Sequence, residues 1–148
     1  MLVRRAVPSD SSQWAALRQA LWPPEEPGEH EREIAAFFAG TLHDVADVFL
    51  AIDESGRAVG FAEVSLRSHA ESCHSTPVAY LEGWFVDEAV RRSGVGAALI
   101  EAVEAWGRSQ GCHEMASDTE LDNVISQQAH QALGFEEVDR VVCFRKFL

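Results

Sequence analysis

The sequence is short of positive charge. Twelve Lys and Arg stand against 24 Asp and Glu, which gives a formal net charge of −12 at pH 7. Proteins that bind nucleic acid neutralise phosphates with clustered Lys and Arg, so this balance argues against a nucleic-acid partner. It argues equally against docking on an anionic membrane surface. A cationic or amine substrate is compatible with this charge.

Long apolar runs and paired cysteines are missing as well. No stretch approaches the ~20 apolar residues that span a bilayer, and the first residues lack a signal-peptide pattern, so we expect a cytoplasmic protein. The three cysteines are widely spaced and odd in number, which argues against a disulfide framework. Two Cys-His neighbours lack the spacing of metal ligands, so we expect no metal site.

The 148 residues, 47% of them hydrophobic, suffice for one domain with a substantial core. No repeat or linker divides the chain, so we treat residues 1–148 as a single domain. The alternation of strand and helix patterns predicts an α/β fold with a mixed central sheet of about six to seven strands and about four helices. The expected strands are residues 2–5, 48–52, 58–66, 78–86 and 113–117, with one or two closing strands within 138–147.

The clearest expected helix begins at Val95 and carries one apolar stripe that reaches Trp106. A second helix is expected to begin at Asp122 or Asn123 and to stop at Gly134. Two shorter helices should precede the hairpin, one ending before Pro23-Pro24 and one at Gly40. The residues expected to point inward from the last helix are Ile125, Ala129, Ala132 and Leu133.

The segment Arg91-Arg92-Ser93-Gly94-Val95-Gly96 connects the most apolar strand to the clearest helix. Glycines leave backbone N–H groups accessible, and a helix N-terminus adds about half a positive charge, so the segment suits a pyrophosphate. An ordinary turn at a helix start fits the same residues. The segment is neither a Walker A loop nor a dinucleotide-binding fingerprint.

In its strand, RxxGxG loop, following helix and Gly134-Phe135, the chain resembles the GCN5-related N-acetyltransferase superfamily. The resemblance implies a single-domain fold whose sheet is splayed by a bulge at the cofactor cleft. It also implies that the loop holds the pyrophosphate of acetyl-CoA and that strand amides hold the thioester. The implied cofactor-binding residues are Trp84, Phe85, Val86, Arg91, Arg92, Ser93, Gly94, Val95, Gly96 and Asn123.

Three segments, residues 80–86, 112–119 and 130–137, are similar to the aminoglycoside N-acetyltransferases of the 6′ class. This resemblance implies transfer of an acetyl group from acetyl-CoA to the 6′-amino group of an aminoglycoside by direct attack of the amine. It further implies antibiotic resistance and a homodimer. The apolar ending Val141-Val142-Cys143-Phe144 suits strands that pair or pack across a two-fold axis, although an ordinary core strand fits it too.

Two carboxylates, Glu82 and Asp118, are the candidate catalytic residues. Glu82 lies in the middle of an apolar strand, and Asp118 ends the next strand, at the edge where α/β sheets place their sites. We expect both to approach one cleft, to hold a protonated amine and, through one of them, to remove its proton. A solvated edge glutamate and a capping aspartate are the structural alternatives.

The same resemblance implies the remaining acceptor residues. It places Trp22, Glu25, His69 and Asp139 on the antibiotic, with Asp139 contributed by this subunit or its partner; at Glu25 and His69 close relatives carry other residues. His130 stands where many members have a tyrosine that protonates the leaving thiolate, and a histidine or water can serve instead. Acetylation of another small amine or a protein N-terminus, and a non-catalytic acyl-CoA-binding module, remain open alternatives.

Overall fold

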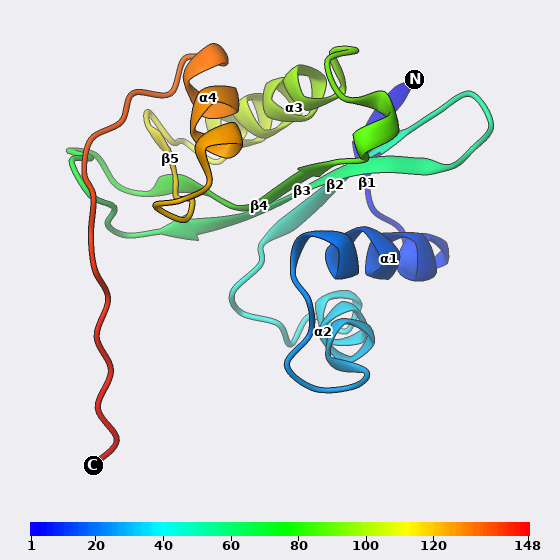
Figure 1. Ribbon diagram of the computed structural model, residues 1–148, viewed down its shortest axis with the longest axis horizontal. Helices are drawn as coiled ribbons and strands as arrows, with labels where there is room; N and C mark the ends of the chain where they lie inside the picture. Colours follow the sequence, from blue (N-terminus) through cyan, green and yellow to red (C-terminus); the bar gives the residue numbers. More distant parts are fainter.

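The computed structural model describes residues 1–148 and contains a five-stranded sheet in the order β1-β2-β3-β4-β5 (Figure 1). The first four strands are antiparallel neighbours, and β5 runs parallel to β4, which confirms the mixed sheet. The strands are β1 (Leu2–Arg5), β2 (Asp47–Ile52), β3 (Ala58–Arg67), β4 (Val78–Val86) and β5 (Met115–Ser117).

Four α-helices cover the sheet, as the apolar stripes predict. Helices α1 and α2 lie on one face, and α3 and α4 on the other (Figure 1). None of these helices combines the length and the apolar content of a membrane-spanning segment. The helices are α1 (Ser11–Leu21), α2 (Glu29–Phe38), α3 (Val95–Ser109) and α4 (Val124–Ala132), and short 3₁₀ turns cover Pro8–Asp10 (η1) and Glu88–Val90 (η2).

Each face of the sheet has its own apolar layer. On the α3 face, Leu99 and Val103 pack with Val64 and Leu81 of the central strands. Because the apolar stripe of α3 repeats at helical spacing, the whole length of the helix contributes to this layer. On the opposite face the buried side chains of the second layer include Trp14, Leu17, Leu50 and Phe61.

The predicted closing strands are absent, so the expected six to seven strands were wrong. Helix α4 ends at Ala132, and after Phe135 the chain runs past the sheet to the C-terminus without strand pairing (Figure 1). Val142 is 70% exposed and Phe144 is 93% exposed. The alternating apolar pattern is typical of a strand, but a strand needs a neighbour for its backbone hydrogen bonds, and this segment has none within the chain.

The inward face predicted for α4 was also wrong in part. Ile125 is 73% exposed, whereas Leu133 packs against the α3 layer. Strand β5 has only three residues, so the sheet offers the first turn of α4 little surface to cover.

A bulge in β4 reorganises the centre of the sheet. Glu63 of β3 lies opposite Gly83, and the next residue, Val64, lies opposite Leu81, so Glu82 is the additional residue. Glu82 therefore hydrogen-bonds to Ser65 on the same face as Gly83, which packs against the ring of Trp22, the residue after α1. Because β4 pairs with β5 only as far as Leu81, the rest of β4 has a free edge, as the expected splay requires.

Candidate functional site

The bulge directs Glu82 into a polar cluster on the α1/α2 face. Its Oε1 accepts hydrogen bonds from the Ser65 hydroxyl at 2.6 Å and from Nε of Arg67 at 3.0 Å, and its Oε2 accepts one from Nη2 of Arg67 at 2.9 Å. The same guanidinium stacks on Tyr80, with its central carbon 3.4 Å from the ring centroid. Glu82 is thus fixed by three donors from the neighbouring strand.

Tyr80 extends this cluster to Asp118. Its hydroxyl donates a 2.6 Å hydrogen bond to Oδ2 of Asp118, which directly follows β5. Burial, and then the neighbouring Asp118, raise the pKa of the Tyr80 phenol, so the phenol stays a neutral donor. The structure therefore places Glu82 and Asp118 in one cluster, as expected from the adjacency of their strands.

The cluster, which comprises Ser65, Arg67, Tyr80, Glu82 and Asp118, is suited to an ammonium ion. It contains two carboxylates and one guanidinium, and so carries a formal charge of −1. Carboxylate oxygens at such a site can bind a cation and accept its proton.

The other predicted acceptor residues are not joined to this cluster by hydrogen bonds. Trp22 ends α1, and its ring fills the space beside Gly83 and meets Phe61 edge-on at 5.9 Å. Glu25 and His69 are exposed, the first between α1 and α2 and the second after β3. Asp139 is exposed in the C-terminal segment, where its carboxylate accepts a hydrogen bond from the following backbone N–H.

The loop before α3 has the geometry of an anion site. Gly94 has φ +88°, and a Cβ there would meet no atom within 4 Å, so its surroundings are open. Arg91 donates from Nε to the Val86 carbonyl at 3.0 Å, and the Ser93 hydroxyl donates to the Val90 carbonyl. The N–H groups of the first turn of α3 lack partners within the helix, so they are available to an anion beside Gly94.

Gly96 has a different role from Gly94. A Cβ at Gly96 would lie 3.0 Å from the Trp84 ring, so this glycine lets α3 approach β4 closely. Val95, between the two glycines, is buried in the α3 layer. Only part of the RxxGxG segment therefore faces open space, whereas Val95 and Gly96 fix the helix on the sheet.

A second polar group lies on the α3/α4 side of the free β4 edge. Nδ1 of His130 is 2.7 Å from the Ser126 carbonyl and so donates to it, which in neutral imidazole leaves Nε2 to accept the Ser117 hydroxyl at 2.8 Å. The Trp84 ring meets His130 edge-on at 5.2 Å. The Asn123 side chain caps α4 by accepting a hydrogen bond from the Ser126 N–H at 3.1 Å.

This side of β4 fits a ligand with a diphosphate and an amide-containing arm. The strand edge beyond Leu81 is unpaired by β5, and Nε1 of Trp84 is buried without a hydrogen-bond partner. An unpartnered buried donor is costly, so a bound acceptor there is favourable. No group of His, Cys, Asp or Glu side chains could hold a metal ion.

Sequence reasoning missed Ser65, Arg67 and Tyr80. A usable signal was present, because Glu63, Ser65 and Arg67 alternate along β3 and so share one face. The bulge that turns Glu82 to that face leaves no such signal. Sequence reasoning also did not identify the contact of Arg67 with the Tyr80 ring.

A buried ionic network beneath the site was missed as well. Oε1 of Glu63 accepts from Nε1 of Trp14 at 3.0 Å and lies 2.8 Å from Nε of Arg18. Nη2 of Arg18 lies 2.6 Å from Glu33, and the guanidinium stacks on Trp22 at 5.3 Å. Burial raises the pKa of Glu63 to about 7 against the opposing effect of Arg18. This network supports the Trp22 ring from below.

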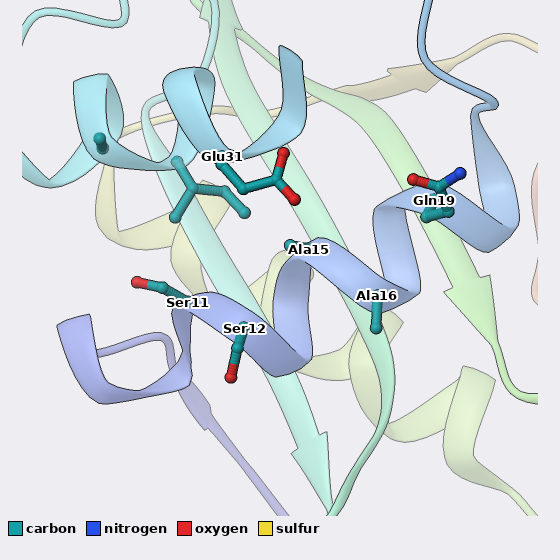
Figure 2. Close-up of a pocket in the computed structure, with 8 residues that line it drawn as sticks. Ser11, Ser12, Ala15, Ala16, Gln19 and Glu31 are labelled. Atoms are coloured by element: carbon teal, nitrogen blue, oxygen red, sulfur yellow. The ribbon is translucent and has the colours of Figure 1, made fainter. Parts of the chain in front are cut away.

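A shallow groove between α1 and α2 is a separate feature (Figure 2). Small and polar side chains of α1 line it, among them Ser12 and Ala16, together with Glu31 of α2. None of the predicted site residues borders this groove, and it contains a single carboxylate. We therefore place the functional site at the free β4 edge and not here.

Comparison with known proteins gives a consistent result across the chain. The sequence model of the acetyltransferase (GNAT) family matches residues 14–135. An aminoglycoside N(6′)-acetyltransferase type 1 of Klebsiella aerogenes is 50% identical over 145 residues, which cover 98% of this chain and 95% of that protein. A protein of the same description from Stenotrophomonas maltophilia is 46% identical, over 97% of this chain and 91% of its own.

Solved structures of similar proteins have the same fold. The aminoglycoside acetyltransferase AAC(6′)-Iy, in complex with the bisubstrate analogue CoA-S-monomethyl-acetylneamine, superposes with a TM-score of 0.89 at 40% identity, covering 99% of this chain and 98% of that chain. The apo 6′-N-acetyltransferase AAC(6′)-IG of Acinetobacter haemolyticus gives a TM-score of 0.90 at 36% identity, covering 100% and 99%.

Proposed function

Because the chain belongs to the acetyltransferase (GNAT) family, we infer that it transfers the acetyl group of acetyl-CoA to the 6′-amino group of aminoglycosides. The observation that carries this inference is the pair of carboxylates, Glu82 and Asp118, gathered at the point where β4 leaves β5. Modification of an aminoglycoside in this way gives antibiotic resistance.

The coenzyme is expected to bind along the free edge of β4. We propose that the amides around Gly94 at the start of α3 hold its diphosphate, with Arg91 and Arg92 adding positive charge. The backbone of Trp84, Phe85 and Val86 and the helix cap at Asn123 border its path. Acetyl-CoA supplies the activated acyl group, and the chain supplies position and charge.

The two carboxylates have different capacities for proton transfer. Glu82 already accepts three hydrogen bonds, whereas Asp118 accepts one side-chain bond, from Tyr80. Asp118 is therefore the better acceptor for a proton of the ammonium group, and Glu82 contributes to holding the cation. The amine lone pair then forms the C–N bond, and a strand amide near Trp84 stabilises the developing oxyanion. The C–S bond breaks as the nitrogen releases its second proton, which leaves a neutral amide.

In this scheme the second proton of the attacking nitrogen reaches the leaving thiolate through water. Nδ1 of His130 is hydrogen-bonded to the Ser126 carbonyl, and its Nε2 lies 2.8 Å from the Ser117 hydroxyl. Both ring nitrogens are therefore already paired within the protein. We propose that His130 orients Ser117 beside Asp118 and does not protonate the thiolate.

We further propose that Trp22, Glu25, His69 and Asp139 contact the sugar rings of the acceptor. Trp22 already borders the cluster through its packing on Gly83. The other three side chains lie on exposed segments and can reach a bound ligand.

A homodimer in the cytoplasm completes the proposal. The segment after Phe135 exposes large apolar side chains, among them Phe144 and Phe147, at 93% and 80%. The free outer edge of β5 and this segment offer unpaired backbone and apolar surface that a second copy can cover. Asp139 lies in this segment and borders the same cavity as Asp118.

Release of thiol from acetyl-CoA with a panel of amines tests the function. We expect steady release with aminoglycosides that carry a 6′-amine and little release with a 6′-hydroxyl analogue, because a neutral hydroxyl is the poorer nucleophile. Turnover with polyamines, amino acids or peptide N-termini instead would establish an acetyltransferase for another small amine or a protein N-terminus. Tight coenzyme binding without thiol release with any amine would establish a non-catalytic acyl-CoA-binding module.

A further inference from the structure

Arg67 stands where a cation of the substrate is expected to bind. Its Nε and Nη2 donate to both carboxylate oxygens of Glu82 at 3.0 and 2.9 Å, and its guanidinium lies over the Tyr80 ring. The Glu82 carboxylate and the face of the Tyr80 ring are also the kinds of group that bind an ammonium ion.

The pairing of Arg67 with Glu82 is accessible to solvent. The Arg67 side chain is 43% exposed and that of Glu82 is 23% exposed. An ion pair in such a position contributes little net stability, so a competing cation can replace the guanidinium. By contrast, the buried pair of Arg18 with Glu63 on the same face, at 7% and 2% exposure, cannot exchange with a ligand in this way.

The charge of the site depends on this one arginine. With Arg67 in place, Glu82 and Asp118 leave a formal charge of −1, and without it the charge would be −2. A small monoamine at Asp118 has no second ammonium group with which to displace Arg67 from Glu82, so it binds beside the guanidinium and is repelled by it. An acceptor with several ammonium groups can occupy Asp118 and displace Arg67 from Glu82 at the same time.

We propose that Arg67 is a specificity-determining residue, a built-in cation that competes with the ammonium groups of the acceptor for Glu82. The inference rests on the proposed acetyl transfer to an amine. Arg67 thereby selects among acceptors by charge. Acceptors with several positive charges displace it from Glu82, and amines with a single charge do not. Arg67 then lowers affinity for every cationic acceptor, and most strongly for those with one amine.

The test is Arg67→Gln, which removes the charge and keeps a polar side chain, although a shorter one. We expect the KM of an aminoglycoside to fall about threefold at low salt, with kcat almost unchanged. The fall should be larger for a monoamine acceptor, and kcat/KM should depend more steeply on salt because the site gains a negative charge. Arg67→Lys, which keeps the charge, should stay close to wild type in salt dependence.

The matched control is Arg5→Gln. Arg5 also forms an exposed ion pair, with Asp47 at 2.7 Å, but it lies on β1 at the opposite edge of the sheet. Removing its charge changes the net charge of the protein equally and should leave KM and its salt dependence unchanged.

A purely structural role for Arg67 predicts the opposite result. If Arg67 only holds Glu82 in place, Arg67→Gln raises KM or leaves it unchanged, and either outcome overturns the proposal. In the wild type, the ¹⁵N-labelled Nε–H signal of Arg67 should move to the position of a solvated side chain when an aminoglycoside is added, and a static signal also overturns it. Absence of wild-type turnover with every amine would instead refute the proposed function.

Discussion

The hydroxyl oxygen of Tyr80 lies 2.6 Å from Oδ2 of Asp118, a hydrogen bond that links β4 to the end of β5. This bond spans the last part of the sheet in which the two strands are paired, since the next residues of β4 have no partner in β5. The Tyr80 ring also packs against the guanidinium of Arg67, which binds Glu82. One aromatic side chain therefore positions both carboxylates of the candidate site, and its removal should affect them differently.

Tyr80→Phe deletes the hydroxyl and keeps the ring under Arg67. Asp118 then loses its side-chain donor and its fixed orientation, so we expect kcat/KM for an aminoglycoside to fall about tenfold, or ~1.4 kcal/mol of transition-state stabilisation. Acetyl-CoA affinity measured by calorimetry should stay unchanged. Unaltered kcat/KM would show that Tyr80 does not position Asp118.

Asp118→Asn and Glu82→Gln separate the two carboxylates. Because Asp118 has the freer oxygens, its variant should lose at least about tenfold in kcat, whereas Glu82→Gln should act mainly on KM. Steady-state kinetics with one aminoglycoside and its 6′-hydroxyl analogue measure both. Full activity of Asp118→Asn would contradict the assignment of the base.

Gly94→Ala tests the anion site before α3. Gly94 has φ +88°, where a side chain costs ~1 kcal/mol, and its open surroundings are those that a diphosphate would fill. We expect weaker acetyl-CoA binding by calorimetry. Gly40→Ala is the control, because Gly40 has φ +75° and equally open surroundings after α2, so it should lose stability without losing coenzyme affinity.

The sequence was informative wherever a local pattern determines the outcome. The strand over Val78–Val86 and the helix from Val95 were predicted correctly, since apolar periodicity and glycine positions are local properties. The grouping of Glu82 with Asp118 followed from strand adjacency. The pairing of Glu82 with Arg67 depends on a one-residue bulge, and the fate of residues 138–147 depends on a partner strand, and neither is a local property.

Glu63 should make the stability of the protein depend on pH. Its pKa is raised to about 7 by burial, above the ~4.3 of an unfolded glutamate, so between these values the native state binds the additional proton. The free energy of unfolding therefore falls as pH rises from about 4.5 to 7 and is level above that range. Glu63→Gln, compared with the wild type in urea titrations across this window, should lack this decline. Parallel profiles would contradict the raised pKa.

The exposed C-terminal segment should hold two copies together. Phe144 is 93% exposed and Phe147 80%, and removing apolar surface of this kind from water is favourable by ~25 cal/mol per Å², before the entropic cost of association is subtracted. Light scattering at micromolar concentration should give twice the mass of the chain for the wild type. Phe144→Asp places a charge in the surface that a second copy would cover, and it should shift the mass toward the monomer. Phe144→Leu keeps the surface apolar and should remain dimeric. A wild-type protein with the mass of a single chain would refute the dimer, and a dimeric Phe144→Asp would place the interface elsewhere.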